Sequence, residues 1–390
     1  MKAQHAVGLD LSWTRVTTVF LIDMGILVLA GRWPGDAKAA TYAWWSGVGI
    51  AVLVALIALV TYRRVPISTM WAAWLGDQFA DPEPALSRGR TRAVDHHRRF
   101  GREPIGMREH QGRLVTVISV GGRAVQATGR HRRGSEPVTL PLERLAAGLR
   151  QFDVRLDSID IVTVGTRNAP ADVEEVDFDD DTPSMPDHRQ TWLVLRMDPQ
   201  HNVNAVAARD SLAATLAAAT ERLAEEIDGR QLIARALRAD EFEAVDDAVL
   251  AGLEAGQLRH RLFRTPPEGH VTNFWVSPAD ISVENLEHLW YPETDTTVVT
   301  VRLAPGGGRT TAVSVLVRYH STGRLGRNVR AALNRFVGRR QLEAVCASLP
   351  APTAHPRMAV PSRELQDGDH LAVSVDAVPE YETPSPGTRS

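Results

Sequence analysis

The sequence is poor in lysine and cysteine, and both absences restrict what the protein can do. Lys2 and Lys38 are the only lysines among 390 residues, so arginine supplies nearly all the positive charge. A P-loop needs a lysine at its phosphates, so we predict that the glycine-rich stretch Gly306–Gly308 is a loop between strands and not a nucleotide site. The single cysteine, Cys346, excludes an intramolecular disulfide and agrees with a reducing cytoplasm.

The common catalytic motifs are missing as well. The sequence has no Gly-x-Ser-x-Gly, His-Glu-x-x-His or paired-cysteine metal motif. The run Asp95-His96-His97 occurs in metal-dependent phosphoesterases, but the arginines that follow it here would repel a dication. Catalytic groups can converge from distant positions, so missing motifs do not exclude an enzyme. We nevertheless expect no catalytic, cofactor-binding or metal-binding residue, and interaction with other molecules is the better hypothesis.

Long hydrophobic runs are confined to the first 64 residues. A helix rises about 1.5 Å per residue, so roughly 17 to 20 residues cross a hydrocarbon core of about 30 Å. Two runs meet this length and predict a transmembrane helical hairpin with spans at about 15–33 and 44–62. A cleaved signal peptide followed by one anchor is the alternative. Asp23 inside the first run and the closely following second run favour the hairpin.

Basic residues near the spans predict the orientation of the hairpin. Lys2 and Arg15 precede the first span, and Arg32 and Lys38 lie in the connecting turn. A larger number of arginines follows the second span, beginning at Arg63. This balance places both termini in the cytoplasm and leaves a short turn outside.

The predicted hairpin contains candidate contact residues for other membrane subunits. Asp23 is the most unusual, because ionisable groups at membrane depth are costly and usually face protein or water. A polar contact to another subunit, a proton-related site and pairing inside the hairpin, with Thr61 or Ser46, are the three interpretations; pairing is favoured. Small residues recur at four-residue spacing in the second span and permit close helix approach. They are Gly47, Ala51 and Ala55.

Residues 65–110 are predicted to form a juxtamembrane segment. Apolar positions from Ile67 to Phe79 predict an amphipathic helix that lies along the membrane, docks on a partner or packs on the chain's own domain. We expect the arginines that follow to contact anionic lipid or another subunit, or to form a solvated face. Without interleaved aromatic residues, they do not favour nucleic acid. The candidate residues of this segment are Trp71, Trp74, Arg88, Arg90, Arg92, Arg98 and Arg99.

The rest of the chain predicts a cytoplasmic α/β (α+β) domain with mixed sheets covered on one face. Alternating β-branched residues predict strands, and amphipathic periodicity predicts helices. The first half, 111–255, has predicted strands Arg113–Val120, Ile159–Val164 and Thr191–Met197 and helices Leu142–Gln151, Val203–Ile227 and Asp240–Leu253. The second half, 256–350, has predicted strands Val271–Val276, Thr297–Leu303 and Thr311–Tyr319 and helices Val283–Leu289 and Asn328–Leu349. This order is consistent with two duplicated β-α-β-β-α units, which requires the same strand order in both.

Two further segments do not fit this order. Residues 171–188 are densely acidic and are interpreted either as a cation site or as a self-repelling disordered insertion. The glycine turn and spaced glutamate of a calcium loop are missing, which favours the insertion. Residues 351–390 form a proline-rich tail that we expect to be disordered after about Ala377.

Short motifs spread over nearly the whole chain carry a family resemblance. They are Met1–Gln4, Leu11–Asp23, Trp44-Trp45, Asp95–Arg102, Leu149–Asp153, Thr191–Met197, Arg209–Leu212 and Val317–Ser321. Together they resemble EccE, the E component of the mycobacterial type VII (ESX) secretion system, and in particular the paralogue of the fifth ESX system.

The resemblance implies a structural subunit without catalytic activity or cofactor, located in the cell inner membrane. Its partners would be EccB, the ATPase EccC and EccD in one hetero-oligomeric complex, together with membrane lipid. No catalytic residues exist in that family to carry over. A membrane-tethered enzyme and a lipid-sensing regulatory module are the alternatives. Converging carboxylates in a deep pocket would favour the enzyme, and lipid binding that depends on Arg88–Arg102 would favour the module.

Overall fold

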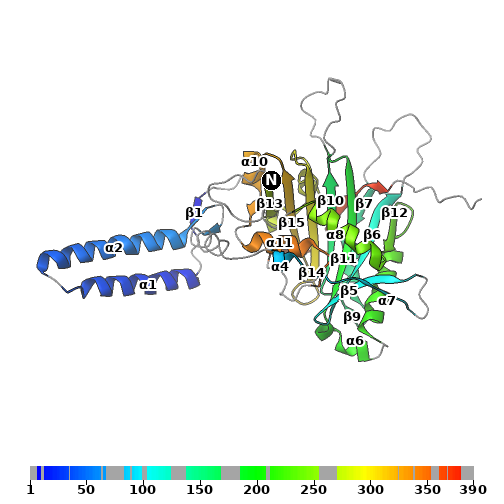
Figure 1. Cartoon of the computed structure of the whole chain (residues 1–390), viewed down its shortest axis with the longest axis horizontal. Helices are drawn as coiled ribbons and strands as arrows, with labels where there is room; N and C mark the ends of the chain where they lie inside the picture. The colour runs from blue at the N-terminus through cyan, green and yellow to red at the C-terminus, as the bar shows by residue number, and fades with distance from the viewer. Residues whose placement is uncertain are drawn as a thin grey trace, which may run out of the picture.

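The computed structural model consists of a helical hairpin and an α/β domain (Figure 1). It describes residues 7–9, 13–34, 36–62, 65–66, 83–87, 90–98, 103–123, 138–167, 185–207, 211–253, 270–323, 325–336, 339–352, 360–366 and 368–378. Three predicted segments lie outside the described residues. They are the amphipathic helix at 67–79, residues 171–184 of the acidic segment and the tail beyond Val378.

The hairpin consists of α1 (Trp13–Gly31) and α2 (Ala37–Leu59). Residues Lys38–Leu59 are long and apolar enough to cross a membrane, whereas the apolar part of α1, Val16–Gly31, is shorter. The predicted second span is therefore shifted, because the helix begins before residue 44 and ends before residue 62. A small antiparallel sheet lies at the open end of the hairpin, in the order β1 (Val7–Leu9), β2 (Val60–Tyr62), β3 (Val65–Pro66).

The domain is built on one 12-stranded sheet. Along its main path the order is β16 (Asn334–Arg335), β13 (His270–Trp275), β15 (Thr311–Ser321), β14 (Thr296–Pro305), β10 (Ser158–Thr166), β11 (His188–Met197), β6 (Arg113–Arg123), β5 (Ile105–His110), β4 (Val94–His96). Off this path, β6 also pairs with β12 (Leu232–Ala236) and β19 (Ala377–Val378), and β15 pairs with β17 (Arg363–Leu365). Separate two-stranded sheets join β7 (Val138–Pro141) to β18 (Ala372–Val375), and β8 (Arg150–Gln151) to β9 (Val154–Arg155).

The six long strands that the sequence predicts are confirmed, and they form one 12-stranded sheet that is almost entirely antiparallel. Every pairing along the main path of the sheet is antiparallel, and only β19 runs parallel to its neighbour β6. The physical reason is the connectivity: consecutive long strands such as β14 and β15 are joined by short turns, which return the chain in the opposite direction.

Strand order is the same in the two predicted halves. In each half the third strand lies between the first and the second, giving β6–β11–β10 and β13–β15–β14. The middle of the sheet is the antiparallel pair of β10 and β14, in which Ile161 faces Val301. The two halves therefore meet the requirement set for a duplication, which stays a prediction.

Both faces of the sheet are covered, so the predicted single covered face was wrong. Side chains alternate along β6: Leu114 and Ile118 belong to one hydrophobic cluster, and Val115 and Val117 to another. The first face packs against α5 (Leu142–Gly148), α7 (Leu212–Ile227) and α9 (Val283–His288). The second packs against α8 (Phe242–Leu250) and α11 (Arg339–Ser348), with α4 (Glu83–Ser87) beside α11.

Two predicted helices are each divided in the structure. Helix 203–227 separates into α6 (Val203–Ala207) and α7, because Ser211 caps a new helix by accepting a hydrogen bond from the Ala214 amide, 3.0 Å away. Helix 328–349 separates into α10 (Arg327–Ala332) and α11, with β16 between them. In β16, the Asn334 amide group donates to Ser277 Oγ at 3.0 Å, so pairing with distant residues overrides the local helical pattern.

Smaller differences concern the ends of elements. Helix α5 ends at Gly148, because the next residues turn into the β8–β9 hairpin. The predicted tail is part of the fold as far as β19, since β17, β18 and β19 each pair with a strand of the domain. Three short 3-10 helices complete the described elements, at Pro199–His201, Ala239–Glu241 and Pro278–Asp280.

Candidate functional site

The predicted small-residue stripe lies largely between the two helices of the hairpin. A Cβ atom added to Gly47 would overlap the Cβ atom of Ala30 on α1. Ala51, one turn further along α2, is buried, and Ala55 is half-buried. The close approach that these residues permit is therefore made to α1 of the same chain.

Asp23 also lies on the inner side of the hairpin. It shares a helical face with the buried Val19 and the half-buried Ile26 and Ala30. Its Oδ1 atom is buried and has no hydrogen-bond partner among the residues that the structure describes. The predicted bond to Ser46 is not formed, because that hydroxyl donates to the Ala43 carbonyl of its own helix, at 2.9 Å. The carboxyl group thus keeps an unfilled hydrogen-bonding position.

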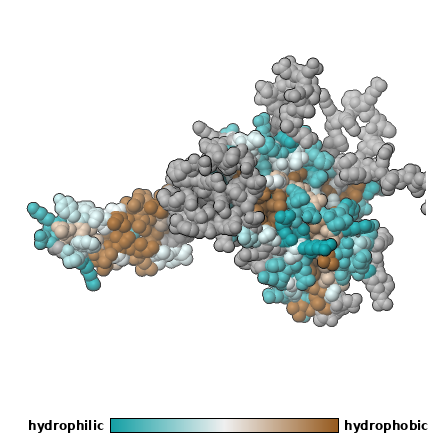
Figure 2. All heavy atoms as spheres, viewed as in Figure 1, coloured by the Kyte–Doolittle hydropathy of each residue, from teal (hydrophilic) through white to brown (hydrophobic). Residues whose placement is uncertain are grey.

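The outer surface of the hairpin is apolar. Figure 2 shows a hydrophobic band across the visible face of α1 and α2, which stands out against the mostly hydrophilic surface of the domain in the same view. The exposed apolar side chains include Phe20, Leu21, Leu29, Ile50, Leu53 and Leu56. Such a surface is suited to lipid tails or to apolar helices of other proteins.

Some arginines of the predicted basic segment form ion pairs with the domain and are therefore not free to bind other molecules. Arg90 forms an ion pair with Asp246 of α8, with 3.0 Å between Nε and Oδ2, and Arg98 forms one with Glu221 of α7. Arg92 is exposed. The remaining predicted residues of this segment, Trp71, Trp74, Arg88 and Arg99, lie outside the described residues.

Arg92 borders a shallow cavity of about 560 Å³ next to the edge strand β4. His96 and Glu109 also line it, and Met107 and Leu114 form part of its apolar wall. The predicted run Asp95-His96-His97 lies in and after β4, where the Asp95 carboxylate accepts a hydrogen bond from the Ala239 amide. Within the described ranges, no three His, Cys, Asp or Glu side chains form a group that could hold a metal ion.

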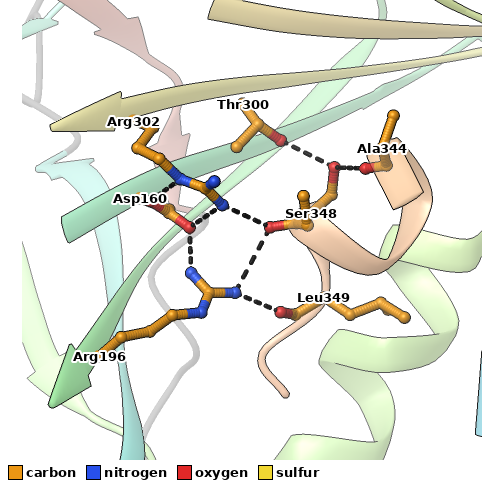
Figure 3. A network of polar contacts seen from close by, with 8 residues as sticks. Asp160, Arg196, Thr300, Arg302, Ala344, Ser348 and Leu349 are labelled. Atoms are coloured by element: carbon orange, nitrogen blue, oxygen red, sulfur yellow. Dashed lines mark hydrogen bonds and ion pairs between the residues drawn. The ribbon is translucent and has the colours of Figure 1, made fainter. Parts of the chain in front are cut away.

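Sequence reasoning missed the main polar network of the domain, which lies between the sheet and α11 (Figure 3). Arg302 on β14 donates from Nε and Nη2 to the two carboxylate oxygens of Asp160 on β10, at 2.8 and 2.9 Å. Arg196 on β11 forms a second ion pair with Asp160. Nη2 of Arg196 donates to the Leu349 carbonyl at 2.6 Å, and Nη2 of Arg302 to the Ala347 carbonyl at 3.1 Å.

These contacts fasten the C-terminal end of α11 to the sheet. The last carbonyl groups of a helix lack intrahelical partners and carry partial negative charge, so two guanidinium groups satisfy them well. Burial raises the pKa of the Asp160 carboxyl, but the charges and hydrogen bonds of Arg196 and Arg302 outweigh this and hold its pKa below the ordinary value. Asp160 is therefore ionised, and it forms buried ion pairs with two arginines.

Two more buried arginines face the second helical layer. Arg108 on β5 forms a two-pronged ion pair with Asp246, at 2.9 and 2.8 Å, and donates to the Pro350 carbonyl at 3.1 Å. Arg318 on β15 donates to the Val249 carbonyl, and within the described ranges its Nε and Nη1 atoms have no hydrogen-bond partner. Burial lowers the pKa of Arg318 to about 10.

His320 lies two residues beyond Arg318 on the same strand and is almost completely buried. Burial, together with the charge of Arg318, lowers the pKa of His320 to about 3. The histidine is thus neutral at physiological pH, and no described residue forms a hydrogen bond with its Nε2 atom. It is an internal group of the fold.

The exposed features are therefore an apolar helical pair and a small number of surface patches, and the described buried charges serve mainly to hold the sheet and its helices together. These features define the class of protein: an apolar helical hairpin, in which one helix is long and apolar enough to cross a membrane, joined to an α/β domain. Comparison with known proteins identifies the family within that class.

A family model described as "type VII ESX secretion system translocon, EccE" matches residues 185–276. The ESX-5 secretion system protein EccE5 of Mycobacterium marinum is 47% identical, over 98% of this chain and 98% of its own length. EccE5 of Mycobacterium tuberculosis is also 47% identical, over 99% of each chain. The ESX-1 secretion system protein EccE1 of Mycobacterium tuberculosis is 26% identical over 68% of this chain and 56% of its own length. The chain belongs to the EccE family, which confirms the resemblance found in the sequence.

Proposed function

We propose that the chain is a structural subunit of the inner-membrane complex of a type VII (ESX) secretion system, without catalytic activity of its own. One observation carries this proposal. An apolar helical hairpin and a domain whose buried carboxylates Asp160 and Asp246 are paired with arginines are joined in one chain that aligns over nearly its full length with secretion-system proteins.

In this proposal both helices of the hairpin cross the membrane. At about 1.5 Å per residue, the 19 residues of α1 extend roughly 28 Å and the 23 residues of α2 roughly 34 Å, close to a hydrocarbon core of about 30 Å. Both termini and the α/β domain lie in the cytoplasm, and the turn between the helices lies outside. The sheet β1–β2–β3 supports this arrangement, because it joins the chain before α1 to the chain after α2.

The partners in this proposal are EccB, EccC and EccD, in a hetero-oligomer that also contacts membrane lipid. The apolar outer surface of the hairpin provides room for transmembrane helices of these subunits. Asp23 provides a polar group that such a helix could satisfy. Gly47 and Ala51 support the same assembly indirectly, because they fix α2 against α1.

A non-catalytic role is supported by the way the titratable groups of the domain are used. Asp160 and Asp246 are both buried and both accept bonds from two arginines. His320 is buried and neutral. Energy for secretion would come from the ATPase subunit EccC, and the chain's part would be to hold the complex together.

The proposal is tested by purifying the tagged full-length chain from membranes in mild detergent. We expect the other subunits of the secretion complex to be recovered with it in fixed ratio. A chain lacking residues 1–64 is the control, and it should recover much less of them. Recovery of the full-length chain alone would contradict the proposal.

A further inference from the structure

The tip of the β8–β9 hairpin presents an unusually exposed aromatic side chain. Phe152 is 90% exposed, although β8 and β9 pack against the domain through the buried Val154 and Gln151. Aromatic side chains bury large apolar areas when they pack, so one left almost completely in water contributes nothing to the core. The exposure of Phe152 therefore needs another explanation.

The backbone conformation of Phe152 is a second, independent indication that this residue has a functional role. The loop between Gln151 and Val154 has two residues, and the first of them, Phe152, has a φ of 58°. Two-residue hairpin loops with a positive φ at the first position are the type that strongly prefers glycine there. For a bulky residue this conformation is an outlier, and such outliers concentrate at binding and functional sites.

A second exposed apolar side chain lies beside this hairpin. The Asn202 side chain accepts a hydrogen bond from the Arg155 amide and donates one to the Arg155 carbonyl, both at 2.8 Å. These bonds hold the start of α6 against β9, and Val203, the first residue of α6, is 65% exposed. Figure 2 shows a hydrophobic patch at the end of the domain where β9 and α6 lie in Figure 1.

Two arginines, Arg222 and Arg155, lie beside Phe152. The guanidinium group of Arg222 lies 5.2 Å from the centre of the Phe152 ring, and its Nη1 atom donates to Gln151 Oε1 at 3.0 Å. Arg155, on the same hairpin, is exposed. Within the part of the chain that the structure describes, neither guanidinium group is bonded to a carboxylate. Both can therefore bind a carboxylate supplied from outside.

We propose that Phe152, Val203 and Arg222, here called the Phe152 patch, dock on the cytoplasmic part of another subunit of the complex. The partner surface is an apolar socket for the Phe152 ring, bordered by carboxylates that pair with Arg222 and Arg155. An exposed aromatic anchor next to arginine is the composition typical of the residues that dominate binding energy at protein interfaces. Figure 1 places β9 and α6 at the lower edge of the domain, away from the helical hairpin, which favours a protein partner over the membrane surface. This inference rests on the proposed function and specifies one of its contacts.

The direct test places a photo-reactive phenylalanine analogue at position 152 of the full-length chain in its native membrane complex. We expect a cross-link to another subunit of the co-purified complex. The matched control carries the analogue at Tyr291, an exposed aromatic residue near the opposite end of β10, and should not give that product. A product with a second copy of this chain, or no product while the complex is intact, would overturn the inference and leave the proposed function standing. Failure of the chain to co-purify with any subunit would overturn both.

Phe152→Gly separates binding from folding. Glycine removes the aromatic anchor and also suits the positive φ, so the melting temperature should stay unchanged or rise. Recovery of the cross-linked neighbour, measured with the analogue at Val203, should fall about tenfold. Arg222→Glu should reduce the same product, because it places a carboxylate opposite the partner's carboxylates. Undiminished cross-linking in both variants would contradict the inference.

Discussion

Arg302 and Asp160 face each other directly across the ladder between β14 and β10, with two hydrogen bonds of 2.8 and 2.9 Å. This ladder is also where the two halves of the sheet meet. One ion pair therefore joins the halves, and with Arg196 it holds the end of α11. The domain depends on a charge cluster at its centre as well as on its apolar layers.

Asp160→Asn should destabilise the domain strongly. It leaves the charges of Arg196 and Arg302 buried without a counter-charge, and breaking a buried ion pair from one side typically costs about 3–5 kcal/mol. Urea unfolding of the detergent-solubilised full chain measures the change. Asp369→Asn is the control, because the Asp369–Arg363 pair is near the surface and should contribute about 1 kcal/mol or less. Equal effects of the two substitutions would contradict this assignment.

His320 should make the protein sensitive to acid. Its pKa is about 3 in the folded protein and about 6.5 in the unfolded chain, so below about pH 6.5 the unfolded chain binds a proton that the folded protein does not. Stability is then lost progressively as pH falls from about 6.5 towards 3, by up to about 1.4 kcal/mol per pH unit.

Replacing His320 by glutamine should flatten this dependence between pH 7 and 4. The measurement is the free energy of unfolding as a function of pH, with His97→Gln, a change at an exposed histidine, as the control. Asp160 contributes to the acid sensitivity at lower pH. Because the pKa of its carboxyl is lowered in the folded protein, its contribution to stability is present above about pH 4 and is lost as the pH falls through the folded-state pKa. An unchanged slope in His320→Gln would show that another group causes the acid sensitivity.

Gly47→Val should separate the two helices of the hairpin. A side chain at 47 would overlap Ala30 on α1, whereas a Cβ atom added to Gly49, half a turn further along α2, would meet no atom within 4 Å. Gly49→Val is thus a matched control with the same change in helix propensity. Hydrogen exchange of α1 peptides, measured by mass spectrometry in detergent, should accelerate in Gly47→Val only. Equal exchange in both variants would contradict the packing.

Asp23→Leu should lower the yield of the intact membrane complex. Within the hairpin the Oδ1 atom of Asp23 has no hydrogen-bond partner, so we expect a neighbouring transmembrane helix to supply one. Met24→Leu, at an exposed position next to it, should leave the yield unchanged. If complex yield is also unchanged in Asp23→Leu, the hairpin acts as an anchor and Asp23 takes no part in assembly.

The sequence predicts those parts of the fold that have a strong local pattern. The β-branched residues that recur along β6 and β10 identify them as strands. This pattern can be read from the sequence because the residues of one strand are neighbours in the chain. The same holds for the apolar length of α2. Ser211 could have marked the start of α7, since a serine just before an apolar periodic run is a helix-capping signal.

Features that depend on distant residues could not be predicted in this way. The strand β16 is two residues long and lies inside a helical pattern, and its pairing with β13 determines its conformation. Asp160 meets Arg196 and Arg302 only after the sheet has formed, and nothing in the neighbourhood of Asp160 indicates two arginine partners. The exposure of Phe152 is likewise visible only once the β8–β9 turn is in place.

The most direct test of the account is the size of the secretion complex in cells that lack this chain. Membranes are extracted in mild detergent, the complex is purified through another subunit, and its mass is measured with and without a complementing copy of the chain. We expect the complex to separate into smaller assemblies without the chain and to recover its full mass with the complementing copy. An intact complex with full secretion in the absence of the chain would contradict its role as a structural subunit.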